Sequence, residues 1–311
     1  MIPWPGVAEV CVLYGPELGA YAFDDPHPFG RRRLPAFWRE FLDRGLDART
    51  AVETPEMADA PTLARFHDGR YVRFVQETRT GYLDSGDTPA FPDAYDAARR
   101  VVGTTLKAVR LVMEGRFRRA FCPIGGLHHA RRDRAGGFCI FNDIGVAIQI
   151  LRSEHDVRRI GYVDIDAHHG DGVYYEYKSD PELFIADIHE NGRFLYPGTG
   201  FANETGVGAA AGTKLNLPMM PGAGEDEFFE AFERVEAFLA AAKPEFIMLQ
   251  CGADSLKGDP LAHLQFSPKT HRHAAERLRA LSPNRLVAMG GGGYSPENIS
   301  RAWCEVIEAL I

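Results

Sequence analysis

The stretch "RIGYVDIDAHHGDG", residues 159–172, decides the fold, because an apolar run here leads straight into a cluster of acidic and imidazole side chains. The run at 159–166 is continuous and not alternating, which is typical of a strand covered on both faces. Burying several carboxylates without a metal, another cation or hydrogen-bond donors would cost roughly several kcal/mol each. The cluster therefore indicates a functional site, and its members are Asp164, Asp166, His168, His169 and Asp171.

Strand-like and helix-like segments alternate along the rest of the chain. Further apolar runs predict strands at 9–15, 119–126, 183–189, 246–254 and 285–294. Apolar residues at helical spacing predict helices at 92–115, 141–154, 225–243, 267–281 and 295–311. This alternation predicts an α/β fold, with one domain over residues 1–311 and a mostly parallel central sheet that has helices on both faces. Ligands of such sheets bind at the C-terminal strand ends, so the active site is expected there.

Composition excludes several classes of protein. The 311 residues carry 35 basic and 43 acidic side chains, and the one short basic tract is "GRRRL" at 30–34, so no direct nucleic-acid binding is expected. Five scattered cysteines without a CxxC pair are expected to be reduced, which favours a cytoplasmic location. The N-terminal residues do not follow the pattern of a signal peptide, and no apolar run is long enough to predict a membrane span.

Three residues form a candidate metal site. Asp166 and His168 are two positions apart, so on an extended chain their side chains point the same way, and Asp254 ends a neighbouring predicted strand. Two carboxylates and one imidazole with a vacant position suit catalytic zinc. The imidazole argues against magnesium or calcium, whereas iron(II) and cobalt are alternatives that these residue types also accept.

Two further motifs supply candidate catalytic groups. The segment "PIGGLHHARRDRAGGFCIFND" (123–143) holds paired histidines, His128 and His129, after two glycines. A histidine titrates in the range needed for a general base, and a carboxylate behind it fixes its tautomer. Asp164 and Asp171 are the candidates for that support.

The glycine-rich segment "MGGGGYSPEN" (289–298) carries the remaining candidate group. Its four glycines allow the backbone to approach another group closely, and Tyr294 can then aim its hydroxyl at a polarised carbonyl. Taken alone, a pair of histidines or a glycine-rich loop would be an ordinary solvated loop. Their coincidence with the acidic cluster favours a catalytic site.

Together these motifs resemble the histone deacetylase family, which has the arginase-deacetylase fold. The similarity follows the chain in order through "GLHHARRDRAGGFCIFND", "YVDIDAHHGDGV", "LQCGADSLKGDPLAHL" and "GGGGYSPENISRAW". The segments "SGDTPAFP" (85–92) and "GRFLYPGTG" (192–200) resemble most the bacterial acetoin-utilisation-type and class I-like deacetylases.

The resemblance implies roles for the polar residues. Zinc would be bound by the three ligands named above. His129 would be the general base and then the acid that protonates the leaving amine, and His128 would assist electrostatically. Asp164 and Asp171 would support His128 and His129, respectively, and Tyr294 would donate a hydrogen bond to the substrate carbonyl.

The resemblance also implies binding positions around the reacting groups. Gly137, Phe138 and Tyr196 would line an acyl-lysine tunnel, Asp87 would hold substrate amides at the rim, and Arg33 would lie in an internal channel near the acetate pocket. Leu261 would be the gatekeeper at the tunnel entrance. Potassium is expected near the zinc, with ligands from Asp164, Asp166, His168, Asp187 and Ile188.

The sequence departs from the family pattern at four positions in or near the expected site. Leu127 stands where many relatives have Trp, and Tyr196 replaces the commoner Phe of the tunnel wall. Asp187 stands where a Ser often helps to bind potassium, which alters that site. Polyamine deacetylases have Glu as the gatekeeper, so Leu261 argues against a cationic polyamine substrate.

The expected activity is zinc-dependent hydrolysis of acetyl-lysine, or of a related acylated amine, to free amine and acetate. The alternative is a small-molecule amidohydrolase such as an acetylpolyamine deacetylase, which would share the catalytic residues. A ureohydrolase of the same fold would need ligands for two manganese ions, and a non-catalytic binding module would have lost a reactive group that Tyr294 and both histidines still supply. The natural substrate, the preferred acyl length and the oligomeric state stay open.

Overall fold

A single parallel sheet forms the centre of the computed structural model, which describes residues 8–311. Its strand order is β2-β1-β3-β8-β7-β4-β5-β6, and every neighbouring pair is parallel. The sheet is therefore wholly parallel, where the sequence predicted a mostly parallel one. The strands are β1 (Val10–Leu13), β2 (Ala51–Glu53), β3 (Arg119–Cys122), β4 (Ile160–Asp164), β5 (Leu183–Glu190), β6 (Lys214–Met219), β7 (Phe246–Gln250) and β8 (Leu286–Met289).

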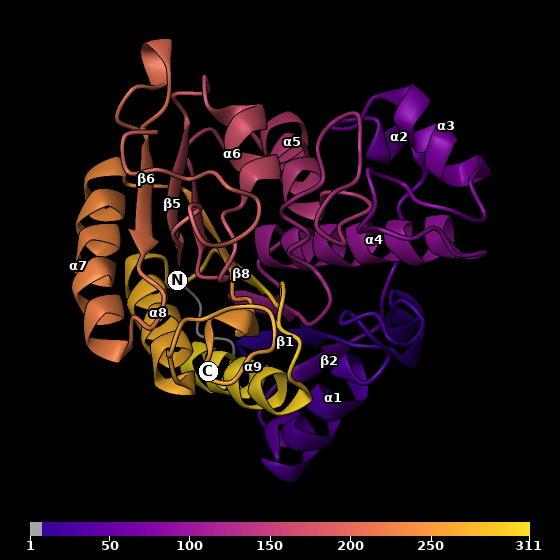
Figure 1. The fold of residues 1–311 in the computed structure, drawn as a ribbon. Coiled ribbons are helices and arrows are strands. Elements are labelled where there is room, and N and C mark those ends of the chain that lie inside the picture. The colour runs from indigo at the N-terminus through magenta and orange to yellow at the C-terminus, as the bar shows by residue number, and fades with distance from the viewer. Residues whose placement is uncertain (1–7) are drawn as a thin grey trace.

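Helices cover both faces of the sheet, as predicted (Figure 1). One layer consists of α1 (Arg33–Asp43), α7 (Glu225–Ala242), α8 (Pro268–Leu281) and α9 (Pro296–Leu310). The opposite layer consists of α4 (Ala94–Met113), α5 (Asp143–His155) and α6 (Asp171–Tyr177), with the short helices α2 (Ala60–Leu63) and α3 (Gly69–Glu77) beside α4. Both faces of the sheet are thus removed from water, which explains the continuous apolar runs.

Strand register brings polar residues to one edge of this apolar core. Asp164, the last residue of β4, pairs with Asp187 of β5 on one side and with Gln250 of β7 on the other. The three side chains are fully buried. Behind them, the buried Trp303 of α9 donates its indole N–H to the carbonyls of Cys251 and Gly290, so α9 is attached to the segments that follow β7 and β8.

Several elements were missed or extended too far in the sequence prediction. The edge strands β2 and β6 and the helices α1, α2, α3 and α6 were not predicted. The predicted strands 246–254 and 285–294 are too long, because the chain leaves the sheet after Gln250 and Met289. The residues beyond form a 3-10 helix, Ala253–Ser255, and a glycine-rich loop.

Among residues 8–311, no helix is long and apolar enough to cross a membrane.

Candidate metal-dependent active site

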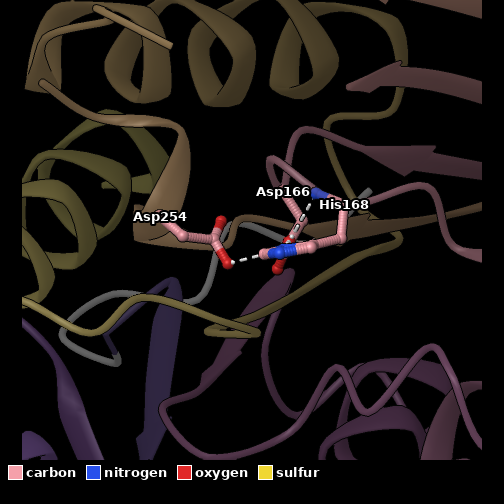
Figure 2. A group of neighbouring side chains, drawn as sticks. All are labelled: Asp166, His168 and Asp254. Atoms are coloured by element: carbon pink, nitrogen blue, oxygen red, sulfur yellow. Dashed lines mark hydrogen bonds and ion pairs between the residues drawn. The ribbon is translucent and has the colours of Figure 1, made fainter. Parts of the chain in front are cut away.

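Three buried side chains meet just beyond the carboxyl ends of β4 and β7 (Figure 2). The ligand atoms of Asp166, His168 and Asp254 all lie within 4.8 Å of one another. His168 Nδ1 lies 3.0 Å from an oxygen of Asp166 and 3.2 Å from an oxygen of Asp254. Asp166 and His168 lie in the loop after β4 and not in an extended strand, so the two-residue geometry expected from the sequence is replaced by a turn.

The donor set fits a single divalent cation. One imidazole and two carboxylates are typical zinc ligands, and three protein ligands leave a position for water or substrate. Burial and the neighbouring charge of Asp166 raise the pKa of Asp254 to about 7. Two carboxylates that repel each other inside the protein are the arrangement that a bound cation relieves.

Hydrogen bonds from neighbouring residues orient the carboxylates of the metal ligands. One oxygen of Asp166 accepts hydrogen bonds from Gln250 Nε2 at 2.8 Å and from the backbone N–H of Gly292 at 2.9 Å. The other oxygen of Asp254 accepts one from the Ala167 N–H at 2.9 Å. A Cβ at position 292 would lie 2.1 Å from Asp254 Oδ2, so this residue of the four-glycine run must be Gly to let the backbone pass.

The two histidines of the second motif lie next to this cluster, each with a carboxylate behind it. His128 Nδ1 is 2.7 Å from Asp164 Oδ2, and His129 Nδ1 is 2.7 Å from Asp171 Oδ1. The Nε2 atoms of the two rings are 3.1 Å apart, and the rings of His129 and His168 are 5.9 Å apart. These are the pairings expected from the sequence.

The histidine pair has two different charge states. Burial by itself would lower the pKa of His128, but the carboxylates of Asp164 and Asp166 outweigh it and raise the pKa to about 10. Burial and the charge of His128 lower the pKa of His129 to about 4, although Asp171 opposes the shift. The two shifts are opposite, so the surroundings favour the charged form of His128 and the neutral form of His129.

Tyr294 also lies close to the metal ligands. Its ring centroid is 6.4 Å from that of His168 and 5.8 Å from that of Phe138, and its backbone N–H donates to Asp259 Oδ2 at 2.8 Å. Burial raises the pKa of the Tyr294 hydroxyl well above its usual value. This hydroxyl therefore stays protonated and can donate a hydrogen bond.

Arg33 is buried close to the same glycine-rich loop. Its guanidinium donates to the carbonyls of Gly293 at 2.9 Å and Gly291 at 2.5 Å and stacks on the Phe29 ring at 3.7 Å. Its Nη1 is buried and has no hydrogen-bond partner among residues 8–311. An unsatisfied buried N–H on a cation is a feature that a small anion such as acetate would satisfy.

Gly137 and Phe138, which are expected to line the tunnel, are partly exposed and lie beside His129. A Cβ at Gly137 would lie 2.2 Å from His129 Cδ2, so Gly137 lets the chain pass directly over that ring. Phe138 has a φ of 67°, which is unusual for an aromatic residue. Its backbone is held by the Tyr21 hydroxyl at 2.8 Å and by Thr88 Oγ1 at 3.1 Å.

The rim residues lie around that backbone. Thr88 Oγ1 donates to Asp87 Oδ1 at 2.8 Å, so the rim carboxylate is connected to the Phe138 wall. The Tyr196 ring lies 5.1 Å from the His129 ring and is 45% exposed. Leu261 is partly exposed, and its N–H donates to Asp259 Oδ1 at 2.9 Å.

Two of the residues expected to bind potassium, Asp164 and Asp187, are hydrogen-bonded within the protein. Asp187 Oδ1 lies 2.6 Å from His189 Nδ1, and its Oδ2 accepts from the Gly170 N–H at 2.9 Å. The oxygens of Asp164 likewise accept hydrogen bonds, from His128, Tyr162 and the Asp166 N–H. Each of these four carboxylate oxygens therefore has at least one polar neighbour within residues 8–311.

Four supporting residues were not predicted. Tyr162 donates to Asp164 at 2.6 Å, and Arg131 donates to Asp171 at 2.9 Å. Gln250 and Asp259 hold Asp166 and Tyr294, as given above. Two of these had a sequence signal, because Tyr162 shares a strand face with Asp164 and Gln250 is a polar residue at the end of a buried strand. Arg131 and Asp259 had none.

The parallel sheet with a buried Asp-His-Asp cluster at its carboxyl edge defines an α/β protein with a candidate metal site. Residues 27–310 match the family described as "Histone deacetylase domain". The chain therefore belongs to the histone deacetylase family, as the sequence motifs predicted.

Individual relatives agree with this assignment. The chain is 34% identical to the "Acetoin utilization protein AcuC" of Bacillus subtilis (strain 168), over 94% of this chain and 80% of that protein. It is 31% identical to "Histone deacetylase 6" of Arabidopsis thaliana, over 95% of this chain and 65% of that protein. The crystal structure of the HDA15 HD domain superposes with a TM-score of 0.92 at 26% identity, covering 97% of this chain and 88% of the other.

Proposed function

We propose that this protein is a zinc-dependent deacetylase that hydrolyses the amide of acetyl-lysine, or of a closely related acylated amine, to free amine and acetate. The observation that carries the proposal is the meeting of Asp166, His168 and Asp254 within 4.8 Å, with the rings of His129 and Tyr294 at 5.9 and 6.4 Å from the His168 ring. A metal site, a neutral base and a protonated phenol are the three parts that amide hydrolysis needs.

Each catalytic side chain has a separate task. Zinc at the three ligands would supply a Lewis acid and lower the pKa of attacking water. His129 would take the proton of that water, while Asp171 holds its Nδ1. Tyr294 donates its hydroxyl to the carbonyl oxygen as negative charge builds there. His129 then returns the proton to the amine nitrogen as the C–N bond breaks, and the charged His128 stabilises the negative charge.

The surrounding residues would position the substrate. We place the methylene stem of an acyl-lysine between Phe138 and Tyr196, where each buried CH₂ contributes roughly 0.8 kcal/mol. Asp87 would accept hydrogen bonds from substrate amides at the rim. The unpartnered N–H of Arg33 would bind the acetate product.

An acetylated polyamine is the alternative substrate. It would use the same catalytic residues and differ only in the cationic group that must be attracted at the entrance. Leu261, at the gatekeeper position, offers no charge for that purpose. We therefore favour acetyl-lysine.

Two further expectations belong to this proposal. A potassium ion would bind near the zinc through Asp164, Asp166, His168, Asp187 and Ile188, and no step above depends on it. All five cysteines are free and buried, which is in keeping with a reducing, cytoplasmic compartment. The 34% identity to a bacterial acetoin-utilisation-type relative supports a bacterial origin of this protein.

The test is a side-by-side activity screen of the zinc-loaded protein. Acetyl-lysine peptides, acetylated polyamines and longer acyl-lysines are compared for release of free amine, with His129→Ala as the inactive control. We expect the acetyl-lysine peptides to have the highest kcat/KM. Absence of hydrolysis of every acylated amine by protein with one zinc per chain would contradict the proposal.

A further inference from the structure

A buried carboxylate close to the site has no role in the reaction proposed above. Glu190, the last residue of β5, is 1% exposed. Its two oxygens hold a single residue: Oε2 accepts from the His263 backbone N–H at 2.7 Å, and Oε1 lies 2.8 Å from His263 Nδ1. Within residues 8–311, no Lys or Arg forms an ion pair with it. A carboxylate placed inside the protein for this one contact indicates that the position of His263 matters.

His263 belongs to a loop, residues 257–265, that we call the entrance loop. The loop begins after Leu256 and ends before Phe266, and these two residues pair in an isolated β-bridge. Asp259 fixes its first half, because one carboxylate oxygen accepts from the Leu261 N–H at 2.9 Å and the other from the Tyr294 N–H at 2.8 Å. The Glu190–His263 contact fixes its second half, so Leu261 lies between two anchored points.

The same residue also contacts the metal-ligand segment. The backbone N–H of Glu190 donates to the carbonyl of Ala167 at 2.9 Å, and Ala167 lies between Asp166 and His168. One residue at the end of β5 therefore connects the ligand segment with the entrance loop. Movement of the loop relative to the metal ligands would have to break this connection.

We propose that Glu190 and His263 are positioning residues for substrate selection. They fix the position of the entrance loop relative to the metal ligands. Leu261 can then contact the part of a substrate that lies outside the tunnel. This inference rests on the proposed function, in which Leu261 is the gatekeeper that an acyl-amine would pass. It adds a determinant of selectivity that does not touch the reacting atoms.

Two variants of His263 separate the contact from the fold. The His263 side chain is 64% exposed, so its removal leaves no cavity in the core. His263→Ala removes the Nδ1 donor and leaves one oxygen of Glu190 unsatisfied. His263→Asn is the matched control, because its amide N–H can replace Nδ1–H toward Glu190.

The experiment compares two inhibitors on zinc-loaded protein. Acetohydroxamate reaches only the metal, whereas a hydroxamate with a long linker and an aryl cap also meets the entrance loop. We expect His263→Ala to weaken the capped inhibitor about five- to tenfold, with acetohydroxamate unchanged within about twofold, and His263→Asn to restore the affinity. Equal weakening of both inhibitors, or no change in either, would overturn the proposal.

Hydrogen exchange provides a readout that does not depend on the reaction. Amides in residues 257–266 should exchange faster in His263→Ala than in the wild type or in His263→Asn, with the zinc content unchanged. Unchanged exchange would refute the positioning role even if the enzyme is a deacetylase. Wild-type protein that binds neither zinc nor acetohydroxamate would refute the proposed function, and the exchange measurement would still decide whether the contact orders the loop.

Discussion

The metal-ligand region and the tunnel entrance differ in how firmly their side chains are held. Asp166 and Asp254 are at most 1% exposed, and hydrogen bonds from other segments orient both carboxylates. At the proposed entrance, Tyr196 is 45% exposed. The buried region has one arrangement, which suits fixed chemistry. The entrance is held at only a few points, so substrate preference can change there without disturbing the reaction.

The largest effect is expected from His129, the base in the buried region. His129→Ala should lower kcat by about 10²–10⁴-fold, because no other neutral group is placed to take the proton. Zinc content, measured by elemental analysis, should not change. His155→Ala, at the end of α5, is the control and should keep full activity. A kcat for His129→Ala close to that of the wild type would contradict the assignment.

Tyr294 should be nearly as important. Tyr294→Phe removes the hydroxyl proposed to hold the carbonyl oxygen and should lower kcat by about 10²–10³-fold, with zinc still bound. Tyr82→Phe, which removes a hydroxyl from a ring that is 55% exposed, should have no effect. Equal activities of the two variants in a steady-state assay would show that the phenol is not needed.

The buried region should also determine how stability depends on pH. His271 of α8 donates Nε2–H to the carbonyl of Gly252, and burial lowers its pKa to about 4. The unfolded chain binds this proton near pH 6.5, so His271 favours the folded state above pH 6.5 and loses this contribution as the pH falls toward 4. In urea unfolding, the free energy of unfolding should fall less for His271→Gln than for the wild type as the pH is lowered from 6.5 to 4. The difference should be roughly 1 kcal/mol per pH unit. Identical pH slopes would contradict this.

The smallest effect is expected at the entrance. Asp87→Ala should raise the KM for an acetyl-lysine peptide by about two- to tenfold and leave kcat nearly unchanged, because one rim hydrogen bond to the substrate backbone is lost. The measurement is steady-state kinetics with a peptide and with free acetyl-lysine, which lacks the flanking residues. A fall in kcat comparable to that of Tyr294→Phe would remove the distinction between the two regions.

The sequence predicted the buried region better than its surroundings. Asp166, His168 and Asp254 could be assigned because buried polar residues after apolar runs have few alternative explanations. The edge strand β6, which includes Asn216 and Pro218, lacks a continuous apolar run, so it was missed. The Glu190–His263 contact could not be predicted either, because 73 residues separate its members and nothing in the motif that contains His263 points to Glu190.

The central claim is that one divalent cation binds to Asp166, His168 and Asp254, and metal titration tests it most directly. Metal-free wild-type protein should bind one zinc per chain with parallel gain of deacetylase activity, and Asp254→Ala should lose both while remaining folded by circular dichroism. Tight binding of one zinc by Asp254→Ala, or full deacetylase activity of the metal-free wild type, would contradict the account.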